Sequence, residues 1–203
     1  MKMFALILMT LAVASAEVVL EGNCPAIEPV RNFDISAYAG TWYHMKKIPV
    51  VNEANGECEI AQYTLNGDSL RLKYSQVING LQEYVVGTAR LADDACDKGK
   101  MILNIEVLDS TIVQPLWVLA TDYKNYSIGY ACKYDSTSNT HKINMWVHSR
   151  TKSLSCESKA EINAFISSKF GYIDPSKFFH VVVSENACRY HTSRLYDGSP
   201  RQH

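Results

Sequence analysis

Apolar and polar residues alternate along much of this chain, a pattern typical of strands with one wet face and one apolar face. The alternation is clearest over residues 70–76, where Leu72 and Tyr74 share a face, and over residues 103–107. Further strands are predicted at 85–91, 114–122, 126–134 and 141–150. Turn residues separate these runs at intervals typical of an all-β barrel or sandwich.

Two Asn-Gly dipeptides connect three of the predicted strands. Asn66-Gly67 lies between residues 60–64 and 70–76, and Asn79-Gly80 lies between 70–76 and 84–86. Asn-Gly tolerates the positive φ angles of a tight hairpin better than other dipeptides do. Two successive hairpins predict an antiparallel meander.

The period changes near the C-terminus. Residues 155–171 carry Ile162, Phe165 and Phe170 at helical spacing, with Ser155 or Ser158 as the N-cap. A last strand is predicted at 178–183, followed by a polar, flexible tail at 191–203. Eight antiparallel strands, one C-terminal helix and a ninth strand favour closure as an up-and-down β-barrel with room for one small ligand.

The first strand of the barrel begins at Gly40-Thr41-Trp42. Asp34 is a candidate N-cap for one helical turn before it, and Gly40 lets the backbone change direction. A tryptophan at the start of a strand is most often a core residue. If Trp42 faces inward, strict alternation places His44, Lys46 and Ile48 on the same inner face.

Length, charge and the N-terminus limit the class of protein. The chain has 203 residues, 47% of them hydrophobic, and a formal net charge of −1, so it forms one domain and has no basic surface for nucleic acid or anionic membranes. Residues 1–16 have the basic start, apolar run and small-x-small site of a secretory signal. We therefore expect a secreted, soluble domain at 17–190, without a membrane span.

Secretion makes the six cysteines candidates for three disulfides, with fifteen possible pairings. No Cys-x-x-Cys pair is present, so neither a zinc site nor a redox motif is predicted. Asn125-Tyr126-Ser127 is a glycosylation sequon, which makes Asn125 a candidate acceptor on a surface turn.

Several short segments together carry a family resemblance. They are Cys24-Pro25, Asn32-Phe33-Asp34, Gly40-Thr41-Trp42, residues 117–126 including Thr121-Asp122-Tyr123, residues 146–150 ending in Arg150, and Glu185-Asn186-Ala187-Cys188. The chain resembles a lipocalin, more narrowly an insect bilin-binding lipocalin of the insecticyanin kind. This resemblance implies a lipocalin calyx, with Trp42 at its closed floor and Arg150 lying across the indole.

The resemblance also implies two disulfides, Cys24–Cys132 and Cys58–Cys188, each worth about 4–5 kcal/mol in the chain-entropy model. Cys96 and Cys156 depart from that pattern. Both fall at the closed end of an up-and-down barrel, so a third bridge, Cys96–Cys156, is predicted.

The inner faces of the predicted strands give a candidate ligand site that is apolar and aromatic with a few polar groups. On the last strand, 141–150, periodicity accepts either face and the resemblance decides between them. The predicted lining comprises His44, Lys46, Ile48, Leu72, Tyr74, Gln76, Val85, Gly87, Leu103, Ile105, Val107, Ala131, Lys133, Asn144, Trp146 and His148.

Charged and titratable groups in this set suggest how a ligand would be held. Lys46, Lys73 and Lys133 near the mouth could meet ligand carboxylates, although solvated surface is an equally good interpretation. His44 and His148 could hydrogen-bond a linear tetrapyrrole, ligate haem iron, or bond only to neighbours or water.

The leading hypothesis is a secreted pigment carrier that binds biliverdin, with the IXγ isomer and a haemolymph or integument location implied by the resemblance. A haem carrier, or a carrier of a retinoid, carotenoid or similar apolar ligand, is the alternative on the same pocket. A pocket-cysteine enzyme is disfavoured because every cysteine has a plausible disulfide partner. Outward Tyr43, Met45 and Trp117 would suit contacts in a homo-oligomer; either face of strand 114–122 could point inward.

Overall fold

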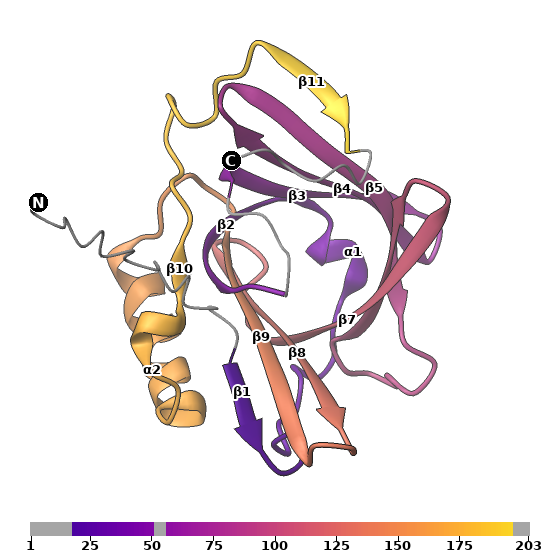
Figure 1. The fold of residues 1–203 in the computed structure, drawn as a ribbon, viewed down its shortest axis with the longest axis vertical. Coiled ribbons are helices and arrows are strands. Elements are labelled where there is room, and N and C mark those ends of the chain that lie inside the picture. Colours follow the sequence, from indigo (N-terminus) through magenta and orange to yellow (C-terminus); the bar gives the residue numbers. More distant parts are fainter. Residues whose placement is uncertain (1–17, 51–55, 197–203) are drawn as a thin grey trace, which may run out of the picture.

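The computed structural model describes residues 18–50 and 56–196, which form a closed antiparallel barrel with a helix on its outside (Figure 1). The eight barrel strands pair in chain order, and the last pairs with the first, β9 with β2. Their bounds are β2 (Gly40–Ile48), β3 (Glu57–Asn66), β4 (Ser69–Ile78), β5 (Leu81–Leu91), β6 (Lys100–Val107), β7 (Ser110–Thr121), β8 (Tyr126–Asp135) and β9 (Thr140–Ser149). The predicted up-and-down barrel is confirmed.

The Asn-Gly turns have the backbone that the hairpins require. Asn79 and Gly80 have φ angles of 51° and 76°, which suits the type I′ turn favoured between antiparallel strands. Gly67 has a φ of 65° between β3 and β4. Both predicted hairpins are therefore present, β3–β4 and β4–β5.

N-cap side chains determine where the two α-helices begin. In α1 (Ile35–Tyr38), the Asp34 carboxylate accepts from the backbone N–H groups of Ser36 and Ala37. In α2 (Cys156–Phe170), the hydroxyl of Ser155 accepts from the N–H of Ser158 at 3.1 Å, so Ser155 is the N-cap and Ser158 is a buried helical residue. A short 3₁₀-helix, η1 (Pro175–Lys177), follows α2.

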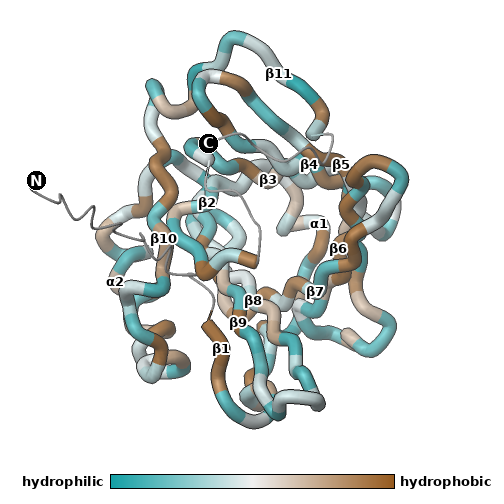
Figure 2. The backbone as a smooth tube through the Cα atoms, viewed as in Figure 1, coloured by the Kyte–Doolittle hydropathy of each residue, from teal (hydrophilic) through white to brown (hydrophobic). Residues whose placement is uncertain are grey.

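Two apolar clusters separate the inside of the barrel from its helix-covered outside. The inner cluster includes Trp42, Leu72, Leu103 and Trp146. The outer cluster lies beneath α2, where apolar helix residues alternate with polar ones (Figure 2), and it includes Ile48, Tyr130, Ile143, Met145, Val147, Ile162 and Phe170. This separation fixes the phase of β9, with Trp146 inside and Met145 outside.

The same clusters fix the phase of β7. Leu116 and Val118 belong to the inner cluster, whereas Trp117 packs against the outer one. Met45 also packs there, so most of its surface is not available for contacts between copies. Association through Tyr43 or Trp117 stays a prediction that light scattering can test.

Three short strands extend the barrel. β1 (Val18–Glu21) pairs with β9, and β10 (Phe179–His180) pairs with β2, which makes the predicted ninth strand shorter than 178–183. β11 (Thr192–Leu195) pairs with β5, so the prediction of a flexible tail is wrong for this part of 191–203. The predicted signal, 1–16, lies outside the described residues.

Two of the three predicted disulfides are present. Cys24–Cys132 and Cys58–Cys188 are formed, whereas Cys96 and Cys156 are free and exposed, so the third bridge is wrong. Both free cysteines do follow strands that end at the closed end. However, the β5–β6 connection lies three strands from β9 around the barrel, at about 4.8 Å per strand, too far for Cα atoms that must approach within about 7 Å.

Candidate ligand-binding cavity

Arg150 closes one end of the barrel over the indole of Trp42. The guanidinium carbon lies 3.6 Å from the ring centroid, and the same group donates to the carbonyl oxygens of Tyr123, Thr41 and Ala37 at 2.9–3.2 Å. A β carbon at Gly40, whose φ is 107°, would lie 2.8 Å from Arg150 Nη1. The glycine therefore makes room for the guanidinium, which lies across the indole at this end of the barrel.

The turn between β7 and β8 supports this closed end. The Asp122 carboxylate accepts from the N–H groups of Lys124, Asn125 and Tyr126. Partial burial raises the pKa of Asp122, but these bonds outweigh it and hold the pKa below its usual value. Asn125 is exposed on this turn, a position compatible with glycosylation, which stays a prediction.

Above the floor, the barrel encloses a cavity of about 550 Å³. Aliphatic and aromatic side chains make up most of its wall. The lining residues are His44, Val50, Ala61, Tyr63, Leu72, Tyr74, Gln76, Glu83, Tyr84, Val85, Leu103, Ile105, Val107, Ile112, Gln114, Leu116, Trp146, His148 and Tyr196. The volume falls in the range of small-molecule sites.

A β-bulge in β2 corrects part of the predicted lining. His44 pairs with His148 and Lys46 with Val147, so Met45 is an extra residue between them. Each bulged residue reverses the alternation that follows it. Lys46 therefore faces outward, within 3.4 Å of the Asn163 side chain on α2, and Ile48 joins the outer cluster. Lys47 takes the inward position.

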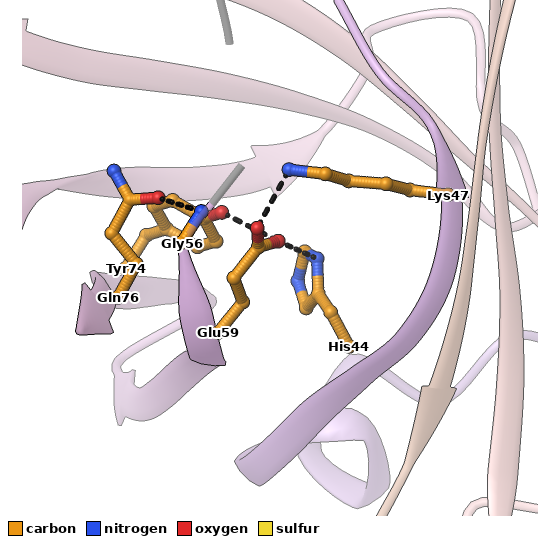
Figure 3. Close-up of polar contacts among 6 residues, drawn as sticks. All are labelled: His44, Lys47, Gly56, Glu59, Tyr74 and Gln76. Atoms are coloured by element: carbon orange, nitrogen blue, oxygen red, sulfur yellow. Dashed lines mark hydrogen bonds and ion pairs between the residues drawn. The ribbon is translucent and has the colours of Figure 1, made fainter. Parts of the chain in front are cut away.

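Lys47 belongs to a buried polar cluster on one side of the cavity (Figure 3). Its Nζ lies 2.8 Å from Oε1 of Glu59, and neither side chain is exposed to solvent. The hydroxyl of Tyr74 donates to Oε2 of Glu59 at 2.9 Å, and Nδ1 of His44 lies 3.6 Å from the same oxygen. We call these four residues the Glu59 cluster.

Sequence reasoning missed Glu59 because the predicted strand began at Ile60, one residue after it. Glu59 has the same parity as Ala61 and Tyr63, which belong to the inner cluster, so alternation continued toward the start of β3 places it inside. The register of β3 with β4 shifts between Glu57 and Ile60, and Cys58 has a φ of 47°. The adjacent disulfide cysteine, Cys58, is the only sequence sign that this segment is fixed.

Two neutral histidines line the cavity beside this cluster. The rings of His44 and His148 are 4.5 Å apart between centroids and almost fully buried. Burial lowers the pKa of His148 to about 3, and burial, His148 and Lys47 together hold the pKa of His44 well below 6.5. Within the described chain, Nδ1 of each ring has no hydrogen-bond partner.

Four other predicted lining residues do not reach the cavity. A β carbon at Gly87 would lie 2.1 Å from the carbonyl oxygen of Asn104, so this glycine allows close strand contact and leaves no ligand volume. Ala131 is buried in the inner cluster, Lys133 is exposed, and the Asn144 amide donates to the carbonyl of Pro49 at 2.7 Å. The remaining predicted members line the wall.

The predicted lysines at the mouth are not cavity cations. Besides Lys46 and Lys133, Lys73 lies on the outer face, with its Nζ 4.4 Å from the ring centroid of Tyr84. The charge near the mouth instead comes from Glu83, whose carboxylate is paired with Arg194.

A cavity of this kind fits a flat, amphipathic molecule. The rings of Tyr63, Tyr74 and Trp146 offer aromatic faces, and the Glu59 cluster with the two imidazoles offers a localised set of polar atoms. No cysteine is among the lining residues that the structure describes, and within those residues no group of three or more His, Cys, Asp or Glu could hold a metal ion. No described helix is long and apolar enough to cross a membrane.

A closed eight-stranded barrel with one closed end and an apolar central cavity defines a class of small-molecule binding proteins. The Lipocalin / cytosolic fatty-acid binding protein family matches residues 39–185. The chain belongs to this family.

Relatives within the family are similar over nearly the whole chain. Insecticyanin-B of Manduca sexta is 36% identical over 190 residues, covering 93% of this chain and 92% of that protein. The Bilin-binding protein of Pieris brassicae is 36% identical over 186 residues, covering 92% and 97%. The solved structure of insecticyanin from the tobacco hornworm Manduca sexta superposes with a TM-score of 0.82, covering 88% of this chain and 96% of that one.

Proposed function

We propose that this lipocalin is a secreted carrier that holds a bilin, biliverdin, in its barrel. The observation that carries the proposal is a mostly apolar and aromatic cavity with one polar side, where His44 and Tyr74 of the Glu59 cluster and the neighbouring His148 line the wall. A linear tetrapyrrole has the same division of character, because its conjugated rings are apolar on their faces while its pyrrole and lactam groups are polar at their edges. Similarity to a protein named for bilin binding supports this choice.

The polar atoms in the wall are suited to the ring nitrogens of such a ligand. The imidazoles of His44 and His148 line the cavity and can exchange hydrogen bonds with the pyrrole and lactam groups, while Glu59 lies behind the His44 ring. The faces of Tyr74 and Trp146 add stacking contacts.

The binding experiment mixes the purified protein with biliverdin. We expect a shifted long-wavelength absorption band that saturates at one pigment per chain, together with quenching of tryptophan fluorescence. Leu103→Trp, which fills the cavity, should abolish the band, whereas Leu65→Trp on the exposed outer surface should not. No spectral change at micromolar pigment would refute the proposal.

The alternatives are separate arms of the same experiment. Haem ligated by His44 or His148 would give a Soret band that His44→Ala or His148→Ala removes. If the protein binds haem or a retinoid more tightly than biliverdin, that molecule becomes the proposed ligand. We also propose the IXγ isomer, which comparison of IXα and IXγ affinities tests.

Secretion is part of the proposal and is supported by two disulfides, which persist in oxidising compartments. Haemolymph or integument is the proposed location, by analogy with the family resemblance. Mass spectrometry of the protein from its source should find Glu17 at the N-terminus, and an intact Met1 would contradict secretion through this signal.

A further inference from the structure

The wall of the barrel is incomplete on one side near its open end. β6 pairs with β5 along Val86–Leu91 in the described structure, and β5 continues toward the mouth from Val85 back to Leu81. The C-terminal strand β11 occupies this edge, where Thr192–Leu195 pair in parallel with Leu81–Tyr84 (Figure 1). The end of the chain thus supplies barrel wall that β6 does not.

Both backbone and side-chain contacts attach β11. The N–H of His191 donates to the carbonyl of Gly80 at 2.9 Å, and the hydroxyl of Ser193 donates to Oε1 of Gln82 at 2.9 Å. Arg194 donates from Nε and Nη2 to the same carboxylate oxygen of Glu83, at 3.2 and 2.5 Å. Charge-assisted bonds of this kind are among the stronger polar contacts.

Alternation along β11 decides which side chains face the cavity. Arg194 pairs with Glu83, which lines the cavity, and Tyr196 has the same parity as Arg194. Tyr196 itself lines the cavity, and its N–H donates to the carbonyl of Tyr84 at 2.8 Å. Leu195 has the opposite parity and is half exposed.

We propose that the C-terminal segment is part of the ligand site, with Tyr196 as a ligand-contacting residue and the Arg194–Glu83 ion pair as the contact that positions it. The inference rests on the proposed function for the identity of the ligand, but the geometry applies to any molecule that fills the cavity. Loss of the segment opens one wall at the mouth and speeds ligand release. By thermodynamic reciprocity, a bound ligand also holds the segment in place.

The first experiment compares two truncated chains, one ending at Tyr190 and one ending at Tyr196. The first lacks β11 and Tyr196, and the second keeps both. We expect biliverdin to dissociate from the first about tenfold faster than from the full chain, which corresponds to about 1.4 kcal/mol, and from the second at the rate of the full chain. Equal rates for all three would overturn the proposal.

Point variants avoid the objection that a truncated chain folds poorly. Tyr196→Ala should raise the dissociation rate, whereas Leu195→Ala on the outer face should leave it unchanged. Arg194→Met should raise it, with rescue by Arg194→Lys if position depends on the charge. Identical rates for Tyr196→Ala and Leu195→Ala would overturn the ligand contact.

Amide hydrogen exchange gives a readout that does not depend on the rate of ligand dissociation. Biliverdin should slow exchange of the amides at residues 192–196 by severalfold in the full chain, and unchanged exchange would contradict the coupling. If the full chain does not bind biliverdin, the proposed function fails. The same variants are then compared with the fluorescent probe 1-anilinonaphthalene-8-sulfonate, and a weaker affinity for Tyr196→Ala alone supports the inference.

Discussion

The Nζ of Lys47 lies 2.8 Å from Oε1 of Glu59, and both side chains are completely removed from solvent inside the barrel. Two buried charges are tolerated because each neutralises the other, and Tyr74 and His44 surround the carboxylate with polar atoms. The ion pair therefore couples the stability of the barrel to the polar part of its cavity.

Removing one partner should be strongly destabilising. Lys47→Met leaves the Glu59 carboxylate buried without its cation, so we expect the free energy of unfolding to fall by about 3–5 kcal/mol. Urea unfolding measures this change, and Lys98→Met, at the partly exposed pair with Glu28, is the matched control with less than about 1 kcal/mol. The double variant Lys47→Met/Glu59→Gln should recover part of the loss; a loss equal to the control would contradict the prediction.

Stability should depend on pH through the cavity histidines. The folded-state pKa of His148 is about 3, below the value near 6.5 of an unfolded chain, so the unfolded state binds more protons between these pH values. The free energy of unfolding is then highest above about pH 6.5 and decreases as pH falls, by up to about 1.4 kcal/mol per pH unit for each such histidine.

His44 adds to this dependence because its pKa is lowered as well. Urea unfolding between pH 7 and 5 measures the slope. His148→Gln should flatten it, whereas His180→Gln, at an exposed position, should not. An unchanged slope in His148→Gln would show that His148 accepts a proton without opening the barrel.

The floor should act on stability and not on ligand affinity. Arg150→Met removes the contact with Trp42 and the hydrogen bonds to four carbonyl oxygens, with an expected cost of about 2–4 kcal/mol. Arg71→Met on the exposed face of β4 is the control. Thermal unfolding and biliverdin titration together check the prediction, and a large loss of affinity in a folded Arg150→Met protein would contradict it.

The native protein should contain two reactive thiols. Cys96 and Cys156 are free and exposed, so a thiol reagent should titrate two groups per chain without denaturant. Cys96→Ser/Cys156→Ser should reduce the count to zero with little change in the melting temperature. A native count of zero would instead restore the third bridge.

Local sequence determined most of the barrel. The Asn-Gly turns, the period-two strands and the caps at Asp34 and Ser155 depend on φ preferences and hydrogen bonds within a few residues, and all of them form as predicted. Alternation from Trp42 also placed His44 inside correctly, because no irregularity lies between the two.

Tertiary structure decided which side chains face inward after a bulge, because alternation in the sequence does not predict the bulge. The extra residue at Met45 exchanges Lys46 for Lys47 at the inner face, where it meets Glu59, a residue that has the same parity as Ala61 in β3. This bulge has no glycine or proline to mark it in the sequence. The Glu59 cluster exists because the bulge in β2 turns Lys47 toward a carboxylate that regular alternation in β3 places inside.

The C-terminal strand and the free cysteines also depend on contacts between segments that are distant in the sequence. Residues 192–195 are mostly polar and too few to predict a strand by themselves, but the unpaired edge of β5 offers them backbone partners. Cys96 and Cys156 share an end of the barrel, but the strand order separates them around its circumference. The sequence by itself determined the barrel and its floor, whereas contacts between distant segments decided which charges and which end of the chain complete the cavity.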